Sequence, residues 1–227
     1  MIREFQAMLG DAKNFVLLGE SGCGKSEIAL NLAFFLSQSG ETHVFDLDQT
    51  KPLFRSRDVA AEAARRGVSV HFSEQYYDAP TLAGGVPERL ANASEYTVLD
   101  VGGNDTGARM IGRFAATLNQ PLAKVFYVVN TYRPWSKNYV TIDGIMTSIL
   151  KVSRLRGIHI LTNPNIGAET TEADFRAGLD RTHELLDPFM AVEGVCVQET
   201  LFEAAKRYTR LPVFPLRLFL NYDWSER

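Results

Sequence analysis

The sequence predicts a three-layer α/β domain built on a doubly wound, mostly parallel sheet. The first observation behind this is the alternation, along the whole chain, of short apolar runs with longer runs of helical periodicity. The second is a glycine-rich turn directly after the first apolar run, which is typical of a βα unit. The third is the length of 227 residues, 45% of them hydrophobic, which suits a single domain over residues 1–227.

The first strand and the first helix are expected on either side of the glycine-rich turn. Residues 14–18 form an apolar run with the length and composition of a buried parallel strand. From Lys25 the period changes, because apolar residues recur on one helical face, namely Ile28, Ala29, Leu32, Phe35 and Leu36. Gly40 stands where a helix of this kind would stop.

The remaining elements continue the alternation. Strands are expected at residues 42–47, 68–72, 96–101, 124–130, 158–162 and 191–197, and a closing extended segment at residues 211–215. Helices are expected at residues 59–66, 86–93, 108–119, 140–156, 171–186 and 201–208. Residues 73–85 and the link around Pro134 and Trp135 are interpreted as irregular segments. This order predicts helices on both faces of the sheet.

Residues 19–26 match the phosphate-binding pattern G-x-x-x-x-G-K-[S/T], the P-loop, between a predicted strand and a predicted helix as the pattern requires. The glycines let successive backbone N–H groups point at phosphate oxygens, and the helix N-terminus adds its dipole. Lys25 supplies a charge for the β- and γ-phosphates, and the Ser26 hydroxyl suits Mg²⁺. The candidate nucleotide-binding residues are Gly19, Glu20, Ser21, Gly22, Cys23, Gly24, Lys25, Ser26 and Glu27.

Acidic residues stand at the ends of two further predicted strands. Asp100 closes an apolar run before Gly102 and Gly103, the position from which an acid supports the Mg²⁺ shell of a P-loop and a flexible loop senses the γ-phosphate. Of Asp46 and Asp48, only Asp48 lies beyond its strand, so Asp46 is expected to be a buried support. The expected catalytic residues are Lys25 and Asp48, and the expected metal-binding residues are Ser26, Asp48 and Asp100.

The net charge, the apolar runs and the cysteines of the chain argue against several classes of protein. A net charge of −3 argues against a general nucleic-acid binder, and no run approaches the ~18 apolar residues of a membrane span. The start of the chain carries no secretory pattern. Cys23 and Cys196 are far apart and lack metal-ligand spacing, which fits a reducing compartment. We therefore expect a cytoplasmic protein, and we interpret its four isolated histidines as structural.

With these residues in place, the chain resembles the ParA/MinD-type ATPases, in the group of P-loop proteins that includes nitrogenase iron protein and the signal-recognition GTPases. Residues 45–48 (Phe-Asp-Leu-Asp) are similar to that family's strand-end motif, and residues 99–103 (Leu-Asp-Val-Gly-Gly) to its Walker B and switch II region. The stretch from residue 197 to the Pro-Val pair at 212–213 is similar to its final strand, helix and closing segment. The resemblance implies that Asn163 reads adenine, and that ATP and Mg²⁺ are the cofactors.

The chain departs from this family inside the P-loop. The family carries a second lysine after the first glycine, which reaches the nucleotide of a partner subunit, and here that position is Glu20, followed by Ser21 where glycine is usual. A carboxylate there repels a triphosphate, so the family's ATP-sandwich homodimer is not carried over directly. Lys51 and Arg55 are candidate substitutes, and Gln49 stands where the family often has proline. A homodimer stays among the expected partners, beside ATP or ADP and an unidentified protein.

A second resemblance covers a shorter stretch. Residues 19–30 are very similar to the P-loop and helix start of HPr kinase/phosphorylase, and the rest of that family's active site has no counterpart here. We therefore expect an ATP-binding P-loop protein, a Mg²⁺-dependent ATPase acting as a ParA/MinD-like nucleotide switch. The alternatives are a kinase that transfers phosphate to a protein or small molecule, and a nucleotide-binding module with little turnover, which Glu20 favours.

Overall fold

The computed structural model describes residues 3–48, 60–72, 85–103 and 105–220 of the chain. The predicted irregular segment at 73–85 therefore lies outside the described residues, apart from Gly85. Gln49, Lys51 and Arg55 also lie outside them, so their expected roles stay predictions.

The centre of the molecule is an eight-stranded sheet in which every strand pair is parallel, in the order β3-β2-β4-β1-β5-β6-β7-β8. The seven predicted strands are thus confirmed, the predicted extended segment at 211–215 overlaps the eighth strand, and the predicted mostly parallel sheet is wholly parallel in the described residues. Every residue of β1 and β2 is buried, because helices cover both faces of these strands. The strands are β1 (Asn14–Gly19), β2 (Thr42–Leu47), β3 (Val68–Phe72), β4 (Tyr96–Val101), β5 (Ala123–Val129), β6 (His159–Thr162), β7 (Val192–Gln198) and β8 (Val213–Leu216).

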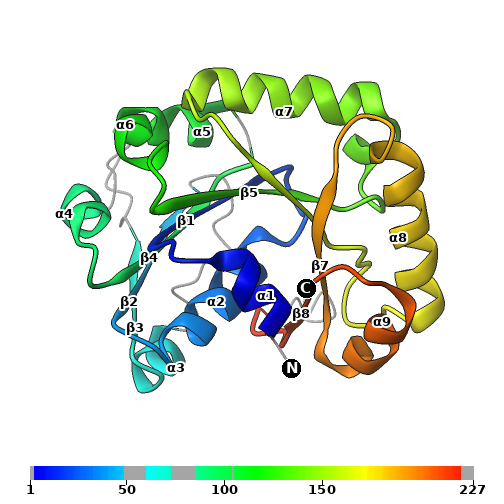
Figure 1. Cartoon of the computed structure of the whole chain (residues 1–227), viewed down its shortest axis with the longest axis horizontal. Coiled ribbons are helices and arrows are strands. Elements are labelled where there is room, and N and C mark those ends of the chain that lie inside the picture. Colours follow the sequence, from blue (N-terminus) through cyan, green and yellow to red (C-terminus); the bar gives the residue numbers. More distant parts are fainter. Residues whose placement is uncertain (1–2, 49–59, 73–84, 104, 221–227) are drawn as a thin grey trace, which may run out of the picture.

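The helices form a layer on each face of the sheet, as predicted. They are α1 (Arg3–Leu9), α2 (Lys25–Leu36), α3 (Ala60–Arg65), α4 (Val86–Ala91), α5 (Asp105–Ile111), α6 (Ala115–Leu118), α7 (Tyr139–Ser153), α8 (Glu172–Leu186) and α9 (Phe202–Tyr208). In Figure 1, α5 and α7 lie above the strands, and α1 and α2 lie below them. Alternate residues of β1 belong to two separate apolar clusters, so that Phe15 and Leu17 pack toward α2 while Val16 and Leu18 pack toward α5 and α7.

Three local features differ from the sequence-based expectation. Helix α1 was not predicted, and its Phe5 ring stacks on Phe214 with ring centroids 4.2 Å apart. The helix expected at 108–119 is divided into α5, a 3-10 turn at Gly112–Phe114 and α6. A Cβ at Gly112 would lie 2.9 Å from Val152 O, so glycine lets this turn pack closely on α7. Helix α2 ends at Leu36, before Gly40.

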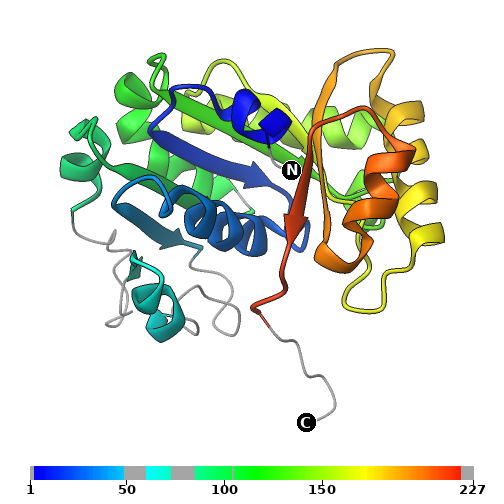
Figure 2. The same cartoon turned by 60° about the horizontal axis from the view of Figure 1, so that its bottom comes forward.

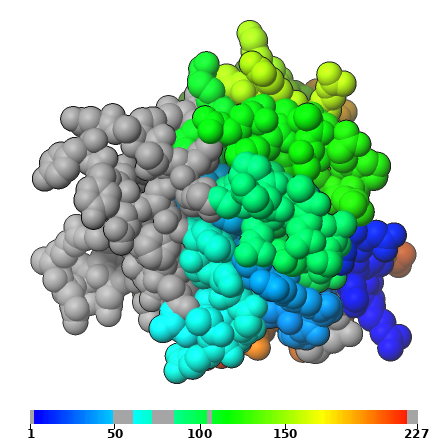
Figure 3. Space-filling view, turned by 90° about the vertical axis from the view of Figure 1, so that its left-hand side faces the viewer, coloured from blue at the N-terminus to red at the C-terminus, as the bar shows by residue number. Residues whose placement is uncertain are grey.

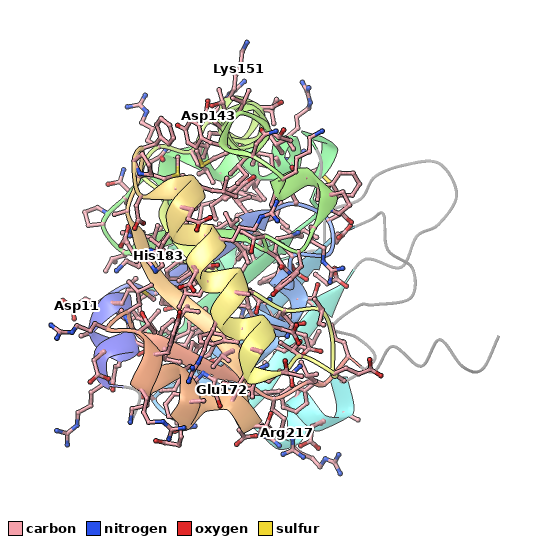
Figure 4. The ribbon with its side chains drawn as sticks, turned by 90° about the vertical axis from the view of Figure 1, so that its right-hand side faces the viewer. Asp11, Asp143, Lys151, Glu172, His183 and Arg217 are labelled. Atoms are coloured by element: carbon pink, nitrogen blue, oxygen red, sulfur yellow. The ribbon has the colours of Figure 1, made fainter. Side chains whose placement is uncertain are left out.

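Helices α7 and α8 are the long helices of the second layer, and Figure 4 shows them from the β8 side of the molecule, with Asp143 and Lys151 on α7 and Glu172 and His183 on α8. Helix α8 begins with a capping box, since Thr171 Oγ1 accepts from the Asp174 N–H while Asp174 accepts from the Thr171 N–H. Among the residues that the structure describes, no helix has the length and apolar character needed to cross a membrane.

The segment after β8 is attached to α2. Asn31 Nδ2 donates to Arg217 O at 2.9 Å, and Asn31 Oδ1 accepts from the Arg217 N–H at 2.9 Å. The Glu27 carboxylate, one turn earlier in the helix, accepts from the N–H groups of Phe219 and Leu220. Figure 2 shows β8 passing beside the blue helix α2. The end of the described chain is therefore held against the helix that begins in the P-loop.

A polar cluster around the buried His43 joins β2, β3 and α4, the side of the molecule that faces the viewer in Figure 3. His43, 2% exposed, has its Nε2 atom 3.2 Å from Glu41 and 3.3 Å from Glu95, and its Nδ1 atom 3.0 Å from His71 Nε2. Arg89 also contacts Glu95, at 2.7 Å. Burial lowers the pKa of His71, and the charges of His43 and Arg89 lower it further. The cluster lies at the amino ends of the strands, away from the candidate site.

Candidate functional site

The candidate site lies at the carboxyl ends of the central strands. Strand β1 stands between β4 and β5, and the chain proceeds from β1 first to β2 on one side of the sheet and later, from β5 onward, to the other side. This is the switch point at which open α/β sheets form a ligand-binding crevice. The P-loop connects β1 to α2 at this point, as the blue segments of Figure 1 show.

The P-loop has the backbone that its glycines permit. Gly19, Gly22 and Gly24 have φ angles of +133°, +78° and +100°, in the left-handed region that side-chain-bearing residues rarely adopt. A Cβ at Gly24 would lie 2.3 Å from the Asn163 amide nitrogen, so glycine is also required there for the close approach of β6. The predicted phosphate-binding loop therefore has a curled conformation in which α2 begins directly at Lys25.

Lys25 lies inside the curl of this loop and is 3% exposed. Its Nζ atom donates to the carbonyl oxygens of Gly19, at 2.9 Å, and Glu20, at 2.8 Å. The Cys23 sulfur is 3.8 Å away, and Cys23 is itself buried. The ammonium group is thus positioned at the mouth of the loop, where the phosphates of a nucleotide would replace the carbonyl oxygens as its partners.

Three side chains from the segments after β5 and β6 donate to three consecutive carbonyl oxygens of the loop. Trp135 Nε1 donates to Ser21 O at 3.1 Å, and Arg133 Nε donates to Gly22 O at 2.8 Å. Asn163 Nδ2, at the end of β6, donates to Cys23 O at 2.9 Å. Asn163 is 4% exposed, and its Oδ1 atom has no hydrogen-bond partner among the described residues.

The carboxylates of Asp46, Asp48 and Asp100 are gathered beside the P-loop. Asp46 in β2 stands opposite Asp100 in β4, which in turn stands opposite Leu17 in β1. All three acids are at most 7% exposed. The Asp48 N–H donates to Asp46 Oδ1 at 3.1 Å, so Asp46 supports the turn that carries Asp48, as expected from the sequence. The side chains of Asp48 and Asp100 are hard oxygen donors of the kind that Mg²⁺ prefers.

The loop after β4 contacts the P-loop directly. A Cβ at Gly103 would lie 2.6 Å from Ser21 N and 2.9 Å from Glu20 C, so this close approach requires glycine. A Cβ at Gly102 would lie 3.2 Å from Asp48 Oδ1, which places Asp48 against the same loop. The three predicted parts of the site, namely the P-loop, the acid after β2 and the Gly-Gly loop after β4, are therefore contiguous.

Glu20 is half-buried at the base of the P-loop. Burial raises the pKa of its carboxyl above the ordinary value, while the Lys25 charge and the Ser21 N–H lower this pKa by smaller amounts. Burial also raises the pKa of Tyr127, and the Glu20 charge raises it further. Neither Glu20 Oε1 nor the Tyr127 hydroxyl has a hydrogen-bond partner in the described part of the chain. The carboxylate that replaces the family's second lysine thus lies in a poorly solvated position.

Glu27 follows Ser26 in the first turn of α2. Its buried carboxylate accepts hydrogen bonds from the backbone N–H groups of Phe219 and Leu220. Burial raises the pKa of Glu27, and the two N–H groups lower it by smaller amounts. Ser26 is half-buried in the first turn of α2, and its hydroxyl makes no hydrogen bond to another described residue.

Arg133 and Trp135 are the site residues that sequence reasoning missed. Both lie in the link between β5 and α7, which was interpreted only as an irregular segment. The signal that could have found them is topological, because the link follows the strand adjacent to β1 and must emerge at the same edge of the sheet as the P-loop. That adjacency is a property of the strand order, which one sequence does not state.

Comparison with known proteins agrees with this arrangement. The family described as CobQ/CobB/MinD/ParA nucleotide binding domain matches residues 15–167. No curated protein sequence matches the chain. The match from residue 15 to residue 167 spans β1 to β6 and therefore includes the whole candidate site.

Solved structures share the fold at low sequence identity. The chloroplast FtsY of Physcomitrella patens matches with a TM-score of 0.53 and 14% identity, over 81% of this chain and 58% of that one. The FtsY of Mycoplasma mycoides matches with a TM-score of 0.51 and 13% identity, over 83% of this chain and 61% of that one. This chain thus corresponds to about three fifths of each. With the family match and the P-loop geometry, these findings show a P-loop nucleotide-binding domain: the chain belongs to the CobQ/CobB/MinD/ParA nucleotide-binding domain family.

Proposed function

We propose that the protein is a Mg²⁺-dependent ATPase that acts as a nucleotide switch, as its resemblance to the ParA/MinD-type ATPases implies. The observation that carries the proposal is the meeting of the P-loop, Asp48 and the loop after Asp100 at one edge of the sheet. Phosphoryl transfer needs little covalent chemistry from the protein, since it depends on positioning and on neutralising charge. The P-loop and Lys25 would position the phosphates and supply positive charge, and the two carboxylates would help to hold the Mg²⁺ that neutralises the remaining charge.

Each residue at this edge has a distinct part in the proposed reaction. Lys25 and the P-loop N–H groups would hold the phosphates, and Ser26 and Asp100 would hold Mg²⁺. The ion would neutralise charge on the β- and γ-phosphates. Asp48, beside Gly102, would orient the attacking water. The Gly103 contact with the P-loop supports a switch, because a γ-phosphate entering the loop would meet the backbone of residues 102–103.

The preference for adenine over guanine rests on Asn163. Its Nδ2 atom is engaged with Cys23 O, so the unpartnered atom is the acceptor Oδ1. Adenine carries an amino group at position 6, which can donate to such an acceptor, whereas guanine carries a carbonyl oxygen there, which cannot. This complementarity supports ATP as the nucleotide.

The experiment is a titration of the purified protein with ATP and with GTP in the presence of Mg²⁺, followed by measurement of phosphate release. Replacing Lys25 with alanine is expected to weaken ATP binding about 30- to 100-fold, since a charge-assisted phosphate contact is worth roughly 2–3 kcal/mol. Lys151→Ala, on the exposed side of α7 in Figure 4, is the matched control. Intact binding by the Lys25→Ala protein would refute the proposal.

The same preparation separates the other functions. Phosphate release without an acceptor supports the switch, and phosphorylation of an added protein or small molecule supports a kinase. Tight binding without turnover supports a nucleotide-binding module, for which the half-buried Glu20 is the favouring observation. Sedimentation with a non-hydrolysable ATP analogue tests whether the nucleotide-bound protein binds a second copy of itself. A protein that stays monomeric under these conditions excludes a nucleotide-sandwiched homodimer.

A further inference from the structure

We propose that Arg133 and Trp135, which we call the P-loop clamp, are positioning residues that hold the loop in its phosphate-binding conformation. This inference rests on the proposed function, because it describes how the same site becomes ready for a nucleotide. The clamp comes from the link between β5 and α7, whereas the P-loop comes from the link between β1 and α2. The two links meet because β1 pairs with β5 along the whole length of β1.

The first argument is the geometry of the peptide group. The C=O of one residue and the N–H of the next point in opposite directions from the same plane. Trp135 and Arg133 donate to the carbonyl oxygens of Ser21 and Gly22. The N–H groups of Gly22 and Cys23 must then point away from the clamp. The Cys23 N–H donates to Glu20 O at 3.3 Å, the same oxygen that accepts from the Lys25 ammonium group.

The second argument is that the clamp is itself held in place. Asn130, 1% exposed, accepts from the Tyr132 N–H through its side chain and donates to Asn165 O at 2.8 Å. The Arg133 N–H donates to Asn130 O, and Arg133 O accepts from the Ser136 N–H in the 3-10 turn Pro134–Ser136. Backbone hydrogen bonds thus fix Arg133 on both sides. A group held in this way loses little further conformational entropy when the ligand binds.

The third argument is charge. No carboxylate of the described residues lies within 4.0 Å of the Arg133 guanidinium group. Within the described ranges, its positive charge therefore has no carboxylate partner beside a loop in which Glu20 supplies a negative charge. A nearby cation strengthens the binding of phosphate groups, and this gain in affinity grows with the negative charge of the ligand. The clamp should matter most for ligands that extend beyond the α-phosphate, because the middle of a P-loop contacts the β-phosphate.

The test measures the affinities of ATP, ADP and AMP for the full chain and for the variants Arg133→Gln, Arg133→Lys and Trp135→Phe. We expect Arg133→Gln to weaken ATP and ADP binding about tenfold and AMP binding less than about twofold, which corresponds to one charge-assisted contact. Arg133→Lys keeps the positive charge but loses the geometry of the Nε donor. Trp135→Phe keeps an aromatic ring but loses the N–H donor. Each variant should therefore weaken ATP binding about threefold. Arg181→Gln is the matched control. Arg181 lies in α8 and donates to Lys137 O, which belongs to the same link as the clamp, and it makes no hydrogen bond to the P-loop among the described residues.

The outcomes separate the clamp from the proposed function. If the wild-type chain binds none of these nucleotides, the proposed function is wrong and the clamp with it. If the wild-type chain binds ATP and both Arg133→Gln and Trp135→Phe bind it equally well, the clamp is wrong and the proposed function stands. Two results would assign Arg133 a merely structural role and overturn the inference. One is an equal loss of affinity for AMP, ADP and ATP in Arg133→Gln. The other is a loss of ATP affinity that is accompanied by a marked fall in the unfolding temperature of the variant.

Discussion

The Asn163 side chain donates a hydrogen bond of 2.9 Å to the backbone oxygen of Cys23, across 140 positions of sequence. This bond ties the end of β6 to the P-loop and explains why residue 24 is glycine, since any Cβ there would collide with the Asn163 amide. It also orients the amide group, so that the Oδ1 atom remains as a buried acceptor without a partner among the described residues. This contact fixes the shape of the loop, and it leaves Oδ1 as the atom that the proposed base contact would use.

Asn163→Asp is the sharpest test of this contact. The substitution replaces the donor with a carboxylate oxygen that faces the Cys23 carbonyl oxygen. We expect the free energy of unfolding to fall by about 1–3 kcal/mol, the usual cost of an unsatisfied buried polar group, and ATP binding to weaken at least about tenfold. Chemical denaturation and calorimetric titration measure the two effects. Asn165→Asp is the control, because Asn165 uses its Oδ1 atom to accept from the Gly167 N–H and aspartate retains that acceptor. Equal behaviour of the two variants would contradict the role of Asn163.

Asp48 and Asp100 are predicted to affect different steps. Asp48→Asn removes the proposed water-orienting carboxylate, so phosphate release should slow by about 10²–10⁴ while ATP affinity stays within a few fold. Asp100→Asn removes the proposed Mg²⁺ support, and it should make nucleotide affinity less dependent on Mg²⁺. Affinities measured with Mg²⁺ and with a chelator, together with single-turnover phosphate release, distinguish the two variants. Unchanged turnover in Asp48→Asn would remove its proposed role.

Glu20 should make nucleotide affinity depend on pH. Burial raises the pKa of its carboxyl, so it becomes neutral at a higher pH than an ordinary glutamate does. A neutral carboxyl no longer repels phosphate, so ATP binding by the wild-type chain should strengthen as the pH falls from 8 toward the raised pKa. Glu20→Gln should bind ATP several-fold more tightly than the wild type at pH 8, and this advantage should disappear at acid pH. Because the phosphates of ATP also titrate, the ratio of the two affinities at each pH is the measurement, and a constant ratio would contradict the prediction.

Glu27 is predicted to act on the C-terminal segment rather than on the nucleotide. Glu27→Ala removes the acceptor of two backbone N–H groups and should lower the free energy of unfolding by about 1–3 kcal/mol. Hydrogen exchange at Phe219 and Leu220 should rise in the same variant, with ATP affinity unchanged within about twofold. Asn31→Ala, which releases Arg217 one turn away, is the matched comparison. A strong loss of ATP affinity in Glu27→Ala would instead place this carboxylate in the nucleotide site.

Much of the fold could be predicted from local patterns. The strands near the centre of the sheet are largely apolar because parallel strands buried on both faces favour apolar residues, and β1 and β2 are buried at every residue. Short elements with mixed composition were harder to predict. Helix α1 spans seven residues, and it is stabilised by the packing of Phe5 on Phe214 rather than by its own sequence. The division of the helix after β4 depends on Gly112 approaching α7, which no local pattern contains.

The sequence by itself determined the P-loop, the acids that accompany it and the class of sheet, because these depend on residue types at short spacings along one chain. Only the tertiary structure decided which distant residues complete the site. It brought Arg133, Trp135 and Asn163 to three consecutive carbonyl oxygens of the loop, and it turned Glu27 toward the C-terminal segment. The physical reason is the strand order: β1 lies between β4 and β5, so loops far apart in sequence emerge at one edge, and only there do their donors and acceptors meet.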